Sequence, residues 1–187
     1  SEHCIATHPS DMCVALSALE AIVQVTGPGG ARAIPMAEFH RLPGDRPEID
    51  TTLRHDEIVT SVELPAASRS FRSHHTYLKL RDRLSYAFAL VSVAVGLEMD
   101  ASRIGRARIA LGGVAHKPWR RPDAEELLTG KPADADAFQA AAGLLLEGAR
   151  GFEHNTFKID LARRAIVRAL GQAAAGTPQS QTDKRIR

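Results

Sequence analysis

The amino-acid sequence predicts an α+β protein, because strand-like runs fill its middle and helical patterns fill its last third. The strand-like runs follow one another with short polar connections, which favours a small antiparallel sheet of three to four strands. About three helical segments come next with apolar side chains on one face, so we expect these helices to cover the sheet. The composition is that of a globular protein, since 44% of the 187 residues are hydrophobic and 25% are charged.

A helix and a strand–turn–strand unit are predicted before this sheet. Ser10 is a favourable N-cap residue and Asp11 adds negative charge to the first turn, so we expect a helix from Asp11 to about Ala21. The following residues predict, in order, a strand (22–26), a glycine-rich turn (27–30), and a returning strand with a short helical turn (31–40). This unit is too small to bury a core by itself.

Residues 41–50 are polar and carry two prolines and a glycine, so they predict a domain boundary. We therefore expect one unit at residues 1–47 and a second at residues 48–175. In the second unit four runs alternate or are apolar throughout, as strands do, and their succession predicts an antiparallel meander. These runs are residues 57–65, 74–83, 86–99 and 104–115.

Three helices are predicted after the strands. A proline and a glycine mark the two ends of a helix at residues 122–130. An alanine-rich helix follows at residues 134–149, and Thr156 is placed to cap a third helix over residues 157–175. The third helix has an inward stripe formed by Ile159, Ala162, Ile166 and Leu170. We expect residues 176–187 to form a disordered tail.

Charge and motifs exclude several classes of protein. The formal net charge is +2, because 24 basic residues nearly cancel 22 acidic ones, so there is no basic field for nucleic-acid binding. No apolar run approaches the roughly 20 residues that span a bilayer, and the first residues have no signal-peptide pattern. The sequence contains no GxSxG, HExxH or Walker motif, so no catalytic residue is predicted.

The residues that commonly bind metals predict no metal site. Cys4 and Cys13 lack the spacing of a zinc or iron–sulfur motif. Their separation permits one disulfide, but two idle thiols are the favoured interpretation. His74 and His75 are adjacent, so in a strand their side chains point to opposite faces. Neither pair is assigned as ligands.

Two polar features are candidates for a binding site. The helix start at Ser10 and Asp11 offers free backbone N–H groups and a positive dipole end, which suits a phosphate or a polar cofactor; simple capping is the alternative. Lys79 lies in mid-strand between two leucines, where its charge either faces a cofactor or reaches toward water. Taken alone, these residues favour simple capping at the helix start and a Lys79 side chain that reaches toward water.

Five segments together form an ordered and specific set. They are CIATHPSDMCVALSALEAIV (4–23), DEIVTSVELP (56–65), YLKLRDRLSYAFALVSVAVGLEM (77–99), ARIALGGVAHKPWRRPDAEELLTGKP (107–132) and FKIDLARRAIVRAL (157–170). In order and spacing they resemble the FAD-binding medium subunits of molybdenum hydroxylases of the xanthine dehydrogenase family. The resemblance is closest to the subunits of bacterial aldehyde oxidoreductases, and it extends to about Gly171.

The resemblance implies a fold and an assembly. Residues 1–47 correspond to the end of the second of two α+β lobes that bind FAD, and residues 48–175 to a C-terminal domain with a small sheet and a helical layer. A large subunit with a molybdenum cofactor oxidises an aldehyde or an N-heterocycle, and iron–sulfur clusters in a small subunit relay the electrons to FAD and on to an acceptor. Such an enzyme is cytoplasmic or periplasmic in bacteria.

The resemblance also implies which residues contact FAD. Ser10 and Asp11 correspond to contacts with its ribityl and phosphate region, Ile58 and Val59 to the apolar pair beside the isoalloxazine ring, and Lys79 to a lysine near that ring. We expect Asp11 to accept hydrogen bonds from ribityl hydroxyls, because a carboxylate repels pyrophosphate. The charge of Lys79 is expected to stabilise reduced, anionic flavin.

These residues are expected to hold only part of an FAD site. The glycine-rich pyrophosphate loop of the family lies in the first lobe and is absent from this sequence, so the chain alone is expected to be inactive. An alternative is an α+β subunit-interaction domain that binds no flavin. A different flavoenzyme with the same FAD lobes, such as a carbohydrate or lactate oxidase, fits the C-terminal motifs poorly.

Overall fold

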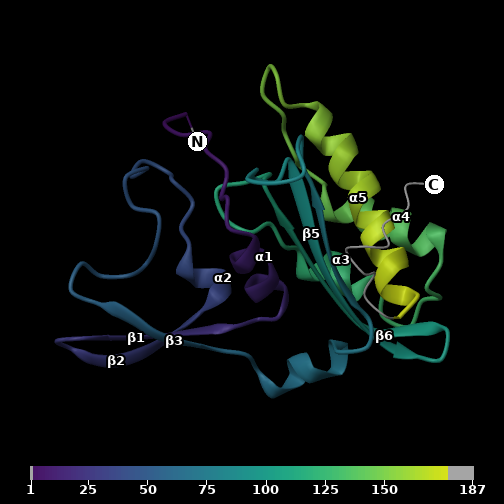
Figure 1. Ribbon diagram of the computed structural model, residues 1–187, viewed down its shortest axis with the longest axis horizontal. Coiled ribbons are helices and arrows are strands. Elements are labelled where there is room, and N and C mark those ends of the chain that lie inside the picture. Colours follow the sequence, from purple (N-terminus) through teal and green to yellow (C-terminus); the bar gives the residue numbers. More distant parts are fainter. Residues whose placement is uncertain (1, 177–187) are drawn as a thin grey trace.

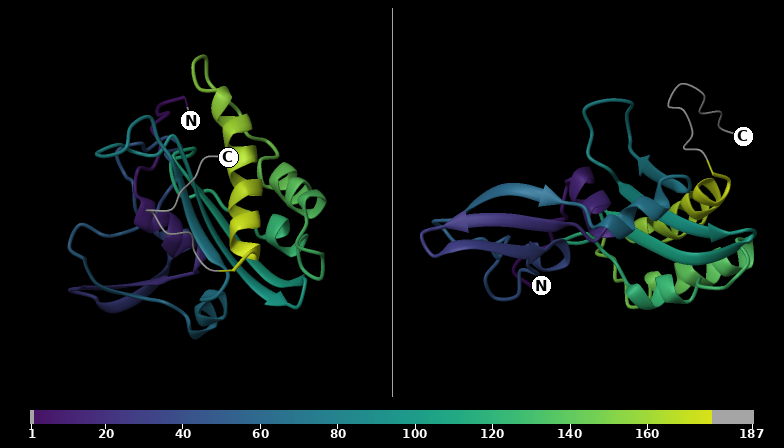
Figure 2. Two further views of the ribbon diagram at one scale, coloured as in Figure 1. Left: turned by 45° about the vertical axis from the view of Figure 1, so that its right-hand side comes forward. Right: turned by 90° about the horizontal axis from the view of Figure 1, so that it is seen from below.

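The computed structural model describes residues 2–176, which form two three-stranded antiparallel sheets and several helices (Figure 1). This architecture confirms the predicted α+β class. Figure 2 shows the first sheet extending to one side of the second, with the C-terminal helices of residues 122–174 gathered beside the second sheet. In chain order the elements are α1 (Asp11–Ala18), β1 (Ile22–Gly27), β2 (Gly30–Pro35), α2 (Met36–Phe39), β3 (Ile58–Glu63), a 3-10 helix (Ala66–Phe71), β4 (His75–Leu80), β5 (Val91–Asp100), β6 (Arg103–Gly112), α3 (Pro122–Glu126), α4 (Ala135–Leu145) and α5 (Phe157–Ala174).

The first sheet has the strand order β2-β1-β3. The predicted four-strand meander is therefore wrong at its first strand, because β3 pairs with β1, with Val62 opposite Val23. The central strand β1 buries Val23 and Val25 and hydrogen-bonds on both sides, whereas every residue of β3 is exposed, as suits an edge strand. The domain division at residues 47 and 48 stays a prediction, although β3 lies beyond it and joins the first sheet.

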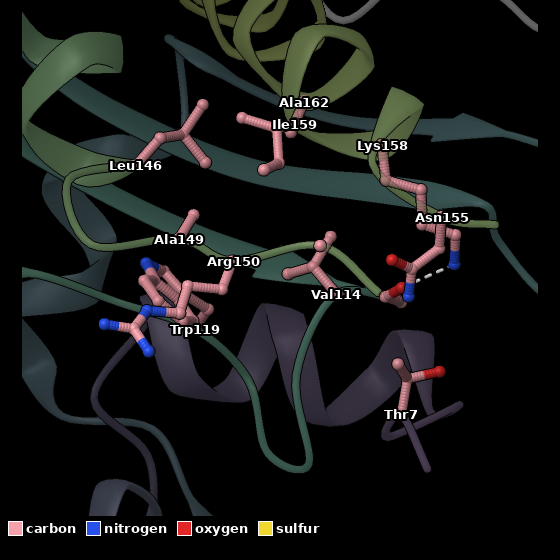
Figure 3. A pocket seen from close by; sticks show the side chains of 12 residues that line it. Thr7, Val114, Trp119, Leu146, Ala149, Arg150, Asn155, Lys158, Ile159 and Ala162 are labelled. Carbon is pink, nitrogen blue, oxygen red and sulfur yellow. Dashed lines mark hydrogen bonds between the residues drawn. The ribbon is translucent and has the colours of Figure 1, made fainter. Parts of the chain in front are cut away.

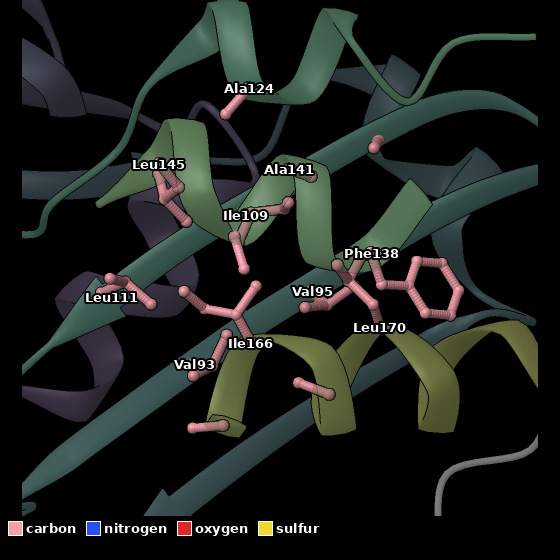
Figure 4. Close-up of a cluster of buried hydrophobic side chains, with 14 of the residues drawn as sticks. Val93, Val95, Ile109, Leu111, Ala124, Phe138, Ala141, Leu145, Ile166 and Leu170 are labelled. Atoms are coloured by element: carbon pink, nitrogen blue, oxygen red, sulfur yellow. The ribbon is translucent and has the colours of Figure 1, made fainter. Parts of the chain in front are cut away.

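The second sheet has the order β4-β5-β6, and its two faces carry different side chains. Toward α4 and α5 the sheet presents large apolar residues, which pack against the inner faces of both helices (Figure 4). Toward α1 it presents small residues: Ala94 and Ala110 contact Val14 and Ala18 of that helix. A Cβ atom built on Gly112 would lie 2.5 Å from Val14 Cγ2, so glycine is needed for α1 to lie this close.

The helix boundaries follow local signals, but α3 and α4 end at Glu126 and Leu145, before the predicted ends at residues 130 and 149. Helix α1 ends at Ala18 rather than near Ala21, because Glu20 adopts a left-handed conformation with φ of 56° and the chain then turns into β1. Thr156 precedes α5 but its side chain makes no capping hydrogen bond. Three of the four stripe residues of α5 are buried, and Ile159 is half-buried. The predicted tail lies outside the described residues from residue 177 onward.

An ionic cluster joins the end of α1 to the second sheet. Glu125 is 3% exposed and accepts hydrogen bonds from Arg120 Nε at 2.7 Å and from the backbone N–H of Ile109 at 2.9 Å. Glu20, just after α1, accepts from Arg120 at 2.8 Å and from Arg108 at 2.9 Å. Since a buried carboxylate is costly without partners, this cluster favours one position of α1 on the sheet. Within residues 2–176, no helix combines the length and apolar character needed to cross a membrane.

Replacing Ile166 by alanine is expected to lower the free energy of unfolding by about 2–5 kcal/mol, because it leaves a cavity in the core. Ile166 is 0% exposed between the sheet and α4. Urea denaturation measures the loss. Arg168→Ala, at an exposed position of the same helix, should change it by less than about 0.5 kcal/mol. Equal effects of the two substitutions would contradict the inward face assigned to α5.

Candidate functional site

The start of α1 is a capped helix terminus. Ser10 has an extended backbone, with φ of −79° and ψ of 112°, and its Oγ accepts a hydrogen bond from the backbone N–H of Cys13 at 3.2 Å. The capping alternative therefore holds for the Ser10 side chain. Its cofactor contact stays a prediction, and the hydroxyl proton is still available to a ligand.

Asp11 and Lys79, which are 68 residues apart in sequence, meet at this helix start. Lys79 Nζ donates to Asp11 Oδ2 at 2.7 Å, and the two side chains are 25% and 38% exposed. Lys79 therefore does not simply reach into water, because its ammonium group pairs with the first residue of α1. The ion pair leaves further lone pairs on the carboxylate and further protons on the ammonium for a third group.

Two residues that the sequence reasoning missed complete this polar group. The Tyr77 hydroxyl donates to Asp11 Oδ1 at 2.8 Å and lies 3.0 Å from Ser92 Oγ. A phenol has one proton, so the Ser92 hydroxyl is the donor in the second contact. Burial, together with the hydrogen bond to Asp11 and its negative charge, raises the pKa of Tyr77, which keeps the phenol protonated at neutral pH.

A signal for both missed residues was present in the strand pattern. Tyr77 and Lys79 are two positions apart on β4, so they point to the same face. Ser92 is the β5 residue directly opposite Lys79 in the antiparallel register. Once Lys79 is a candidate, its neighbours on that face follow from the period of two and from the pairing.

A cavity of about 200 Å³ adjoins Asp11. Its walls come from the segment before α1, from the turn at Gly112 and Gly113, and from Phe88 in the β4–β5 loop. Gly113 has φ of 74°, and a Cβ atom there would lie 2.7 Å from the carbonyl oxygen of Ala89, so only glycine suits this wall. Complete ligand pockets usually measure about 300–1,000 Å³, so the cavity fits part of a cofactor of the size of FAD.

The remaining predicted pair, Ile58 and Val59, lies on β3 at the edge of the first sheet. Their side chains are exposed, at 67% and 44% of the reference area. Among the described residues, no hydrogen bond and no shared buried cluster joins Ile58 or Val59 to the group around Asp11. Their contact with an isoalloxazine ring stays a prediction.

A smaller cavity of about 60 Å³ lies behind the same glycine turn (Figure 3). Its wall includes Trp119, Ile159 and Lys158, and Lys158 Nζ donates to the carbonyl oxygen of Gly113 at 3.0 Å. This volume holds a few water molecules at most. The contact from Lys158 therefore supports the turn that borders the larger cavity.

Two family models match the chain. The model of the FAD binding domain in molybdopterin dehydrogenase matches residues 3–67, which include Ser10 and Asp11. The model of the CO dehydrogenase flavoprotein C-terminal domain matches residues 75–173, which include Tyr77, Lys79 and Ser92. The polar group around Asp11 therefore joins residues from both matched spans.

Comparison with individual proteins points to the same family. The aldehyde oxidoreductase FAD-binding subunit PaoB of Escherichia coli K12 is 44% identical over 94% of this chain and 51% of its own length. The structure of quinoline 2-oxidoreductase from Pseudomonas putida 86 matches with a TM-score of 0.75 and 27% identity, over 91% of this chain and 57% of that one. CO dehydrogenase from Oligotropha carboxidovorans shares the fold, with a TM-score of 0.77 and 24% identity over 89% of this chain and 57% of that one. The chain spans about half the length of the curated relatives it matches.

A double-mutant cycle tests whether Asp11 and Lys79 interact. Asp11→Asn and Lys79→Met are expected to show a coupling of about 0.5–1 kcal/mol in the free energy of unfolding, since the pair is partly shielded from water. Urea denaturation at low salt measures it. Pairing Asp11→Asn with Lys131→Met, at an exposed position after α3, should give no coupling. Full additivity of Asp11→Asn and Lys79→Met would show that the contact contributes nothing.

Proposed function

The chain belongs to the FAD-binding medium subunits of the molybdenum hydroxylase family, and we propose that it forms one wall of the FAD site in an oxidoreductase of that family. The observation that carries the proposal is the 2.7 Å contact between Asp11 and Lys79 beside the 200 Å³ cavity. It joins the helix start of one matched span to a strand of the other. Cofactor sites often lie between two domains, and a site at this junction would need residues from both matched spans.

Asp11 and Lys79 have distinct roles in this proposal. A carboxylate offers about four acceptor positions, of which Tyr77 and Lys79 occupy two. The other positions accept hydrogen bonds from ribityl hydroxyls. Lys79 keeps a positive charge that is only 25% exposed, and it has free donors to direct at an oxygen or nitrogen of the ring. Partial burial strengthens this interaction, because fewer water molecules screen the charge.

The other residues orient the polar groups of the site and form its walls. FAD, when bound, supplies the electron-transfer chemistry. Tyr77 and Ser92 hold the Asp11 carboxylate in place, and Ser10 keeps the first backbone N–H groups of α1 oriented. Gly112 and Gly113 let Val14 and the carbonyl oxygen of Ala89 pack closely against the turn that forms one wall of the cavity. Ile58 and Val59 offer exposed apolar area that an aromatic ring would cover.

At the level of the whole enzyme, we propose that electrons reach FAD from iron–sulfur clusters in a small subunit and leave to an acceptor. A large subunit with the molybdenum cofactor oxidises the substrate, an aldehyde or an N-heterocycle. The 44% identity to a subunit named for aldehyde oxidation favours an aldehyde. This chain contributes contacts to both partner subunits in addition to its part of the FAD site.

The test uses the full-length protein that contains this chain, stripped of flavin. Lys79→Ala and Asp11→Ala are each expected to raise the Kd for FAD about tenfold, since each removes a charge-assisted contact. Flavin fluorescence during titration with FAD measures the Kd.

Lys131→Ala removes an exposed lysine away from the cavity and serves as the matched control, with an unchanged Kd expected. Circular dichroism establishes that each variant is folded. Unchanged affinity in both folded variants would contradict the proposal and favour the interaction domain without flavin.

A further inference from the structure

Three side chains of metal-binding type come together beside the start of α1. They are His8 in the segment before the helix, Cys13 in its first turns and His40 directly after α2. One ligand atom from each lies within 4.8 Å of the other two. Among residues 2–176 this is the one such trio, and it is separate from the group formed by Asp11, Lys79 and Tyr77.

The two imidazoles have nitrogen atoms without partners. His8 Nε2 and His40 Nδ1 are both buried and make no hydrogen bond, and His40 as a whole is only 8% exposed. A buried polar atom without a partner costs about 1–3 kcal/mol, so such atoms are rare without a ligand or an ordered water. The ring centroids are 4.3 Å apart in an edge-to-face arrangement, and each ring places one nitrogen within 4.8 Å of the Cys13 thiol.

The backbone holds these three residues in place. The N–H of His8 donates to the carbonyl oxygen of Ala115 at 2.8 Å, and the N–H of Cys13 donates to Ser10 Oγ. His40 forms an isolated β-bridge with Thr51. Zinc–nitrogen bonds of about 2.0–2.1 Å and zinc–sulfur bonds of about 2.3 Å in a tetrahedron put ligand atoms roughly 3.3–3.7 Å apart. Side-chain movements of about 1 Å would therefore bring the three ligand atoms to coordination distance of one ion.

We propose that His8, Cys13 and His40 bind a zinc ion. Two imidazoles and a thiolate form a borderline-soft donor set that suits Zn²⁺ better than Mg²⁺ or Ca²⁺. Each imidazole can offer one ring nitrogen as a lone-pair donor to the ion, while its other nitrogen carries the proton. The thiol of Cys13 loses its proton on binding.

A second cavity adjoins the trio on the side of the two histidines. His8 and His40 line a cavity of about 370 Å³ whose wall also contains Asp50 and Thr51. This cavity provides an entry path and room for a water molecule as the fourth ligand. The ion would tie the segment that precedes α1 to α2 and the first sheet. It would therefore stabilise the helix start that carries Ser10 and Asp11.

The test measures metal binding by the full-length protein after treatment with a chelator and dialysis. Titration with Zn²⁺ against a competing chromophoric chelator is expected to show a site that is lost in Cys13→Ser and in His40→Gln. In each variant the affinity should fall at least about 100-fold, the upper end of what loss of a supporting residue costs. His55→Gln, at an exposed histidine, is the matched control and should leave the affinity unchanged.

Co²⁺ gives a second, spectroscopic reading of the same site. In the unsubstituted protein it should produce the visible bands of a tetrahedral site together with a thiolate-to-cobalt charge-transfer band, and Cys13→Ser should lose the latter. The proposal is overturned if the unsubstituted protein shows no thiolate band, or if Zn²⁺ binds equally to the protein and to both ligand variants. Flavin content is not measured, so failure of this site and failure of the proposed function are distinguishable.

Discussion

The ion pair between Asp11 and Lys79 is the contact on which the candidate site depends. It forms only because α1 lies close to the second sheet, and the small residues Ala94, Ala110 and Gly112 permit that approach. At the other end of α1, Glu20 joins the buried cluster around Glu125. The helix is therefore held at both ends by charge and along its length by close packing, which fixes where Asp11 can be.

The two faces of the second sheet have different roles: one packs the hydrophobic core, and the other carries the polar residues of the candidate site. One face carries the large apolar side chains that pack on α4 and α5, and this layer supplies most of the core. The opposite face carries Tyr77, Lys79 and Ser92 beside α1. Strand alternation makes this division possible, because successive residues of one strand serve different faces. Polar groups can then be held rigidly, since their strands are fixed by the core behind them.

Local patterns in the sequence were enough to predict the α+β class, most element positions and the cap at Ser10. They were not enough to pair β3 with β1, because strand partners depend on contacts between distant segments. The meeting of Asp11 with Lys79 also needed the fold: local patterns made each residue a candidate, and the resemblance to a family linked both to flavin. The trio of His8, Cys13 and His40 has no motif spacing, so only the structure could reveal it.

The central claim is that Lys79 lies in the FAD site, and chemical labelling tests it directly. Reductive methylation of lysines, read by mass spectrometry, compares the full-length protein with and without bound FAD. Lys79 is 25% exposed, so its side chain is accessible to the reagent when no cofactor is bound. We predict that bound FAD slows labelling of Lys79 while exposed Lys131 is labelled at the same rate. Equal labelling of Lys79 in both states would contradict the account.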